Sequence, residues 1–154
     1  MALRSRTHPF SAYGPGHDDV AKLVTVAHVL IAGVTAAGVA RLIVVGGAGS
    51  LEVAPGLKLV DTPEFPAAWK GLALAAGEAL DVFRAEANAL EWTYFSPAAF
   101  IQPGARTGTF RLGGDQLVTD ANGESKISAE DYAIALIDEL EQPAHIRQRF
   151  TAAY

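Results

Sequence analysis

An unbroken apolar run constrains this chain more than any other feature: Leu-Ile-Val-Val at residues 42–45, followed directly by Gly46 and Gly47. A continuous β-branched run bounded by glycines is typical of a parallel strand that is buried on both faces. The residues before it, up to Gly38, have the pattern of a helix, and a helix that alternates with such strands indicates a βαβ unit. The expected fold class is therefore α/β.

The alternation continues along the chain. We expect a first strand that ends near Ala12, and then a helix that begins near Asp18 and Asp19 and stops at Gly38. The remaining expected elements are a strand at 41–47, a long functional loop at 51–66, a helix at 66–87, a strand at 90–96, a hairpin at 109–119 around Gly113 and Gly114, a helix at 128–140 and a strand at 149–154.

Two of these helices carry local signals. Ser128 and Asp131 have the spacing of a capping box at the start of the last helix. The helix at 66–87 has one apolar stripe at helical spacing, made by Trp69, Leu72, Ala76, Leu80 and Phe83. We expect one domain over residues 1–154, with a core at 10–101 and a C-terminal, substrate-side region at 102–154.

Composition excludes several classes of function. The 154 residues are 50% hydrophobic and 19% charged, which excludes a wholly disordered chain. A net charge of −5 argues against a nucleic-acid partner. The chain has no cysteine, which excludes disulfides and thiol nucleophiles and fits a cytoplasmic protein. No two of the four histidines have metal-ligand spacing, so we expect no metal.

Residues 23–40 contain no charged side chain and are about as long as a minimal transmembrane helix. His28, Gly33, two threonines and many alanines weaken that interpretation. We expect a buried helix of a soluble domain and no membrane partner.

Three segments follow expected strands, and ligands of open α/β sheets bind beyond the carboxyl ends of the strands. We expect one crevice lined by Ala12-Tyr13-Gly14, by Gly46-Gly47-Ala48-Gly49-Ser50 and by Ser96-Pro97-Ala98-Ala99. The glycines either let the chain turn or let its backbone approach a flat or phosphorylated ligand.

Two polar side chains are candidates for chemistry. The Ser50 hydroxyl either donates to a substrate carbonyl or flavin ring, or makes an ordinary turn hydrogen bond. Lys70, in the first turn of its helix, either reaches a ribose or phosphate or is a solvated surface lysine.

Several of these segments occur in an order that resembles a known family. They are 11–14 (Ser-Ala-Tyr-Gly), 42–50, 96–98 (Ser-Pro-Ala) and 127–133 (Ile-Ser-Ala-Glu-Asp-Tyr-Ala). The set resembles the later half of an atypical short-chain dehydrogenase/reductase of the NAD(P)H-binding, flavin-reductase-like group, similar to biliverdin-IXβ/flavin reductase.

The resemblance implies a Rossmann fold, NADP or NAD as cofactor, and hydride transfer to FMN, FAD or a similar ring. It places Ser50 beside the nicotinamide, Ala12, Tyr13 and Gly14 along the cofactor, and Pro97 close to the nicotinamide. The Tyr-x-x-x-Lys pair of many short-chain dehydrogenases is absent.

The glycine-rich turn that holds the cofactor pyrophosphate should precede Ser11, and it is absent from the sequence. We therefore expect a partial Rossmann-like domain that binds NAD(P)H weakly. We also expect it to self-associate through a sheet edge at Phe10 and residues 42–45, or to cover that edge with a rearranged helix. The alternatives are a non-catalytic remnant that serves as a binding module and an NmrA-like nucleotide sensor.

Overall fold

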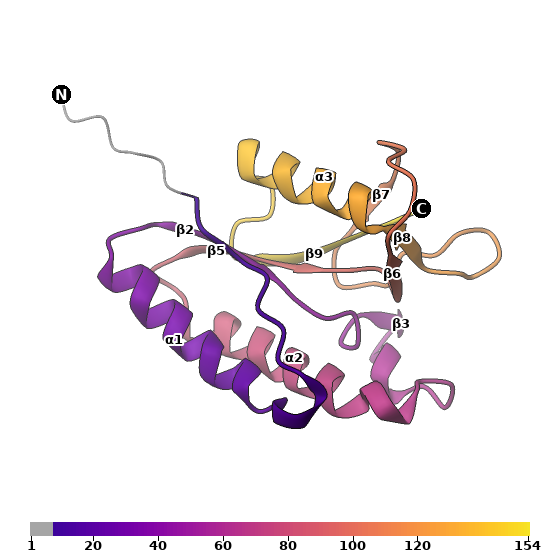
Figure 1. Cartoon of the computed structure of the whole chain (residues 1–154), viewed down its shortest axis with the longest axis horizontal. Helices are drawn as coiled ribbons and strands as arrows, with labels where there is room; N and C mark the ends of the chain where they lie inside the picture. Colours follow the sequence, from indigo (N-terminus) through magenta and orange to yellow (C-terminus); the bar gives the residue numbers. More distant parts are fainter. Residues whose placement is uncertain (1–7) are drawn as a thin grey trace.

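The central sheet of the molecule has five strands and lies between helices on both of its faces (Figure 1). The computed structural model describes residues 8–154, apart from the side chain of His17. The helices are α1 (Lys22–Ala36), α2 (Ala67–Glu86) and α3 (Ala129–Glu141), with short 3-10 turns η1 (His17–Asp19) and η2 (Leu59–Asp61). The strands are β1 (Phe10–Ser11), β2 (Arg41–Val45), β3 (Glu52–Ala54), β4 (Leu57–Lys58), β5 (Glu91–Ser96), β6 (Phe100–Gln102), β7 (Arg111–Gly113), β8 (Lys126–Ser128) and β9 (Gln148–Ala153).

The order of the main sheet is β1-β2-β5-β9-β7, and β1, β2, β5 and β9 are parallel. The expected parallel pair is confirmed, because Ile43 of β2 lies opposite Thr93 of β5. The expected exposed edge at residues 42–45 is wrong. β1 covers this side of β2: Phe10 pairs with Ile43, whose N–H donates to the carbonyl of Pro9 at 3.1 Å.

The expected hairpin at 109–119 is also wrong. β7 pairs antiparallel with β9, with Leu112 opposite Ala152. The residues after β7 turn toward β3 instead, where the Glu52 N–H donates to the Asp115 carbonyl at 2.8 Å. Two distant strands thus supply the partners that a hairpin would have found locally.

Residues 51–66, expected to be an irregular loop, contain the antiparallel pair β3 and β4 followed by η2. The reversal between the two strands includes Gly56, whose φ of 76° lies in the left-handed region that glycine tolerates. Gly38, with φ of 68°, ends the first helix region as expected, and its N–H donates to the carbonyl of Thr35.

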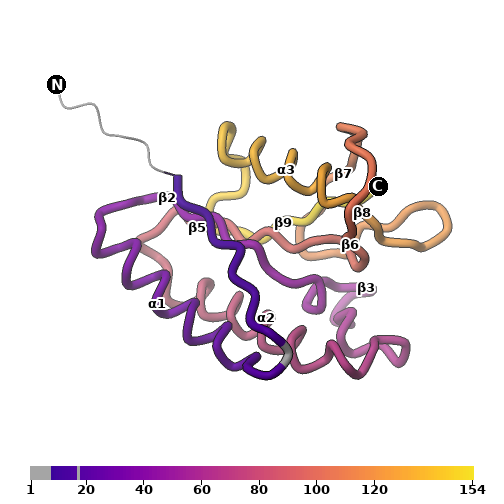
Figure 2. The backbone as a smooth tube through the Cα atoms, viewed as in Figure 1, coloured from indigo at the N-terminus to yellow at the C-terminus, as the bar shows by residue number. Residues whose placement is uncertain are grey.

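Helices α1 and α2 pack together on one face of the sheet (Figures 1 and 2). Their shared core contains Ala27, Leu80 and Phe83 from the helices and Val44 and Trp92 from the strands. The expected stripe on α2 is confirmed at Leu80 and Phe83 but is wrong at Trp69, which is 51% exposed. Trp69 lies in the first turn of α2 and does not belong to the core that α1 and α2 share with the sheet.

Helix α3 covers the other face (Figure 1). There the Phe95 ring stacks on Tyr132 and Phe150, with centroids 4.0 and 4.1 Å away. The expected N-cap is confirmed, because the Asp131 N–H donates to Ser128 Oγ at 3.0 Å. In a capping box the Ser128 N–H would donate back to the Asp131 side chain. Here the Ser128 N–H donates to the Tyr154 hydroxyl instead.

Candidate cofactor and substrate site

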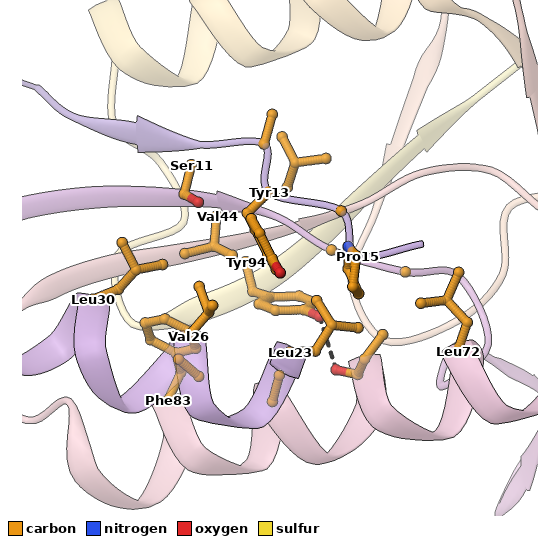
Figure 3. Close-up of a pocket in the computed structure, with 18 residues that line it drawn as sticks. Ser11, Tyr13, Pro15, Leu23, Val26, Leu30, Val44, Leu72, Phe83 and Tyr94 are labelled. Carbon is orange, nitrogen blue, oxygen red and sulfur yellow. Dashed lines mark hydrogen bonds between the residues drawn. The ribbon is translucent and has the colours of Figure 1, made fainter. Parts of the chain in front are cut away.

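Two adjoining cavities open at the carboxyl ends of the parallel strands. The larger has a volume of about 610 Å³ and lies between the loop after β2, residues 59–66, the start of α2 and residues 97–101 after β5. The smaller has about 230 Å³ and lies beneath the segment after β1, against α1 and α2 (Figure 3). Gly47, Leu72 and Ala76 line both. The single expected crevice is therefore two neighbouring hollows.

The structure divides the expected site residues into three groups. The larger cavity is lined by Gly47, Pro97 and Ala98, and the smaller by Ala12, Tyr13, Gly14, Gly46 and Gly47. Ser96 is fully buried at the end of β5, and its hydroxyl has no hydrogen-bond partner among residues 8–154. Ser50 and Lys70 line neither cavity.

The glycines after β2 are explained by packing within the protein. A Cβ atom at Gly49 would lie 2.6 Å from Cβ of Ala73, and one at Gly47 would lie 2.9 Å from Cβ of Ala76. A Cβ atom at Gly46 would overlap the ring of Tyr94. The small residues of α2 thus let the helix press against this loop, so the glycines fix the cavity floor.

The Ser50 side chain is held from behind this floor. Arg149, on β9, donates from Nη1 to Ser50 Oγ at 2.8 Å and from Nη2 to the Ser50 carbonyl at 3.2 Å. Its Nε donates to Asp115 Oδ1 at 2.8 Å. The Arg149 side chain is only 3% exposed, so these bonds are largely shielded from water. Ser50 has a hydroxyl proton of its own left to donate.

Arg149 was not among the residues expected from the sequence. The available signal was a basic residue inside the expected last strand, at the start of an otherwise apolar run. Asp115 is its counter-ion and also accepts from Arg84 Nη2 at 2.9 Å. Burial raises the pKa of Asp115, but hydrogen bonds and charge from Arg149 and Arg84 outweigh it, so that the pKa lies below its usual value.

The ionisable side chains around the larger cavity are few. Glu64 is the only one among the described residues that line it. Lys70 is exposed on the first turn of α2 and lies outside the lining. The walls are otherwise mainly aliphatic and aromatic, as is usual for cavities that bind small molecules.

The smaller cavity is lined almost entirely by apolar side chains. Figure 3 shows Leu30, Val26 and Phe83 toward one end and Leu72 toward the other, with Tyr13 above Tyr94. The Tyr94 hydroxyl donates to the Ala76 carbonyl at 2.8 Å, the dashed line in Figure 3. Burial raises the pKa of Tyr94 to about 12, so the side chain stays neutral and packs as an aromatic wall.

Among residues 8–154, no helix combines the length and the apolar character needed to cross a membrane. Within the same range, no three His, Asp or Glu side chains gather where they could hold a metal ion.

The sequence matches known proteins over most of its length. Residues 3–143 match a family described as NAD(P)H-binding. The uncharacterised protein YwnB of Bacillus subtilis is 49% identical over 114 residues, which are 72% of this chain and 53% of YwnB. The chain therefore spans about half the length of this curated relative.

Solved structures with the same fold include three close relatives. A candidate exported protein from Burkholderia pseudomallei is 56% identical, with a TM-score of 0.88 over 94% of this chain and 70% of its own. A candidate NADH-flavin reductase from Streptococcus pneumoniae is 38% identical, with a TM-score of 0.85 and the same shares. A candidate epimerase from Bacteroides thetaiotaomicron is 47% identical, with a TM-score of 0.86 over 94% of this chain and 66% of its own.

The parallel sheet, the ligand-sized cavity at its carboxyl edge and these matches agree with one another. The chain belongs to the NAD(P)H-binding family, in its atypical short-chain dehydrogenase/reductase, flavin-reductase-like group.

Proposed function

We propose that this protein is an NAD(P)H-dependent oxidoreductase that passes a hydride to a flavin or a similar planar ring. The observation that carries the proposal is the cavity of about 610 Å³ between the loop after β2 and residues 97–101, at the carboxyl edge of the sheet. Its volume is within the range of small-molecule sites, and its mainly apolar walls fit two stacked rings.

The residues of the chain would bind and orient the rings. Gly47 and Gly49 form a floor that is fixed by Ala73 and Ala76 of α2, and Pro97 and Ala98 form the facing wall. The bound reduced nicotinamide would supply a hydride, and the acceptor ring would take up the hydride together with one proton from solvent. Apolar walls on both sides would keep water away from the reacting faces.

No proton relay from the protein is required between the two rings. Transfer between stacked rings depends on their distance and orientation, which a rigid cavity supplies. Ser50 lines neither cavity, so it enters the proposal as a residue that positions the adjoining floor through its hydrogen bonds to Arg149. Lys70 is exposed and lies outside the lining, so it enters the proposal only as a cation that could contact a ribose or phosphate of the cofactor outside the cavity.

One observation favours a second candidate function. Neither Ser50 nor Lys70 lines either of the two cavities described above, so the chain could bind a nucleotide without turning it over, as a binding module or nucleotide sensor. This candidate predicts binding of NADPH or NADH with no reduction of any acceptor.

The two candidates are separated by measuring binding and turnover on the same sample. NADPH and NADH are titrated into the protein while its unfolding temperature is followed. Loss of nicotinamide absorbance is then measured with riboflavin as acceptor. A stabilising shift with acceptor-dependent oxidation is the result expected for the oxidoreductase. A shift without oxidation would favour the binding module, and no shift at all would contradict both.

A further inference from the structure

The charge on the lining of the larger cavity bears on which rings it accepts. Glu64 is its single ionisable side chain among the described residues, and the remaining lining is mostly aliphatic, aromatic and glycine. The Thr62 hydroxyl is engaged, since it donates to the Leu59 carbonyl at 2.8 Å. A substrate that enters the cavity therefore meets one negative charge and no basic side chain in the lining.

We propose, building on the proposed function above, that this cavity accepts an uncharged planar ring and that Glu64 selects against rings that carry a phosphate or carboxylate. Glu64 is exposed, so solvent screens its repulsion of an anionic competitor, and the expected discrimination is modest in size. Discrimination of this kind depends on repulsion of the wrong substrate rather than on tighter binding of the right one.

Two features could offset the negative charge: Lys70 and the start of α2. Lys70 is exposed and lies outside the lining. The start of α2, which carries the positive end of the helix dipole, is preceded by Glu64 two residues before the N-cap Pro66. The Glu64 carboxylate is thus close in sequence to this helix end, where it competes with a substrate anion for the positive end of the dipole.

Riboflavin and FMN test the proposal directly, because they share a ring and differ by one phosphate. Dissociation constants are measured from flavin fluorescence quenching at low ionic strength, without nucleotide. We expect the wild-type protein to bind riboflavin about threefold or more tightly than FMN, the size expected for one screened like-charge contact. Glu64→Gln should bring the two constants together, and Glu64→Lys should favour FMN.

The matched control is Glu78→Gln, which removes the same charge from an exposed position on α2 outside the cavity lining. It should leave the preference for riboflavin unchanged. Raising the salt concentration should shrink the preference in the wild type, because Glu64 is exposed. Unfolding temperatures of all variants are compared to show that each is folded.

Equal or tighter binding of FMN by the wild type would overturn the proposal, as would an unchanged ratio in Glu64→Gln or no binding of either flavin. The outcome is separable from that of the oxidoreductase function. A preference for riboflavin without NAD(P)H oxidation would sustain the charge selection and remove the reductase. Equal reduction of both flavins would sustain the reductase and remove the charge selection.

Discussion

Arg149 joins three parts of the chain that are far apart in sequence: β9, the loop at Ser50 and the segment at Asp115. Its guanidinium is buried, and each of its three nitrogens donates to an oxygen of Ser50 or Asp115. Removal of one partner would leave a buried donor unsatisfied, which costs about 1–3 kcal/mol.

We therefore expect Ser50→Ala to lower the free energy of unfolding by about 1–2 kcal/mol and to slow flavin reduction. Lys70→Ala should change the stability by less than about 0.5 kcal/mol and slow turnover less, because Lys70 is exposed and outside both cavities. Urea unfolding and steady-state turnover measure the two effects. Equal turnover of Ser50→Ala and wild type would remove Ser50 from the reaction.

The contact between Gly46 and Tyr94 gives a second prediction at this scale. A methyl group at Gly46 would overlap the Tyr94 ring, so Gly46→Ala should destabilise the protein by about 2 kcal/mol or more. The overlap vanishes when the ring is removed. In the double variant with Tyr94→Ala, the loss of unfolding free energy should therefore be clearly smaller than the sum of the two single losses. A double-mutant cycle measured by urea unfolding would show this. Strictly additive losses of unfolding free energy would mean that the Tyr94 ring is not the reason why position 46 requires glycine.

Sequence reasoning predicted the segments that line the cavities better than the contacts of their individual residues. Gly47, Pro97 and Ala98 were predictable as lining because they follow parallel strands. The partners of Ser50 and Gly46 were not, because Arg149 and Tyr94 come from strands whose register and facing direction the local pattern does not specify.

At the scale of elements, the start of α3 organises the segment before it. Asp131 is fully buried and accepts from the Thr107 hydroxyl and the Gly108 N–H, and also from the Tyr154 hydroxyl. Burial raises its pKa, but these hydrogen bonds outweigh that effect and lower the pKa to about 2.

This shift gives a pH dependence with a definite sign. The pKa of Asp131 in the unfolded chain is about 3.9, above its folded value. The stabilisation is therefore complete above pH of about 4 and is lost as the pH falls toward about 2. Asp131→Asn should flatten this part of the curve of unfolding free energy against pH. A curve of unchanged steepness in the variant would contradict the assignment.

The elements that could be predicted are those whose sequence signal lies within a single segment. The helices and the β2–β5 pair follow from periodicity and apolar runs within single segments. The pairing of β7 with β9 was not predictable, because it joins residues about forty positions apart and a Gly-Gly dipeptide favoured a local hairpin. The β3–β4 pair was missed because proline and glycine around it indicated a loop.

At the scale of the whole molecule, β1 ends the sheet with only two residues, and Phe10 on it is 55% exposed. A short edge strand limits pairing with another chain, but an exposed apolar side chain on that edge favours it. We expect reversible self-association through β1, detected by sedimentation across a range of concentrations. Phe10→Lys should shift the protein toward the monomer, and a wild type that stays monomeric at every concentration would contradict the prediction.

The central claim is that the nicotinamide lies in the cavity between the loop after β2 and residues 97–101. Saturation-transfer NMR on NADPH tests it directly and tolerates weak binding. The wild type should saturate the nicotinamide protons more strongly than the adenine protons. Ala99→Trp, which fills the cavity, should abolish this pattern, whereas Ala85→Trp on an exposed part of α2 should preserve it. Equal nicotinamide saturation in all three proteins, each with an unchanged unfolding temperature, would place the cofactor elsewhere.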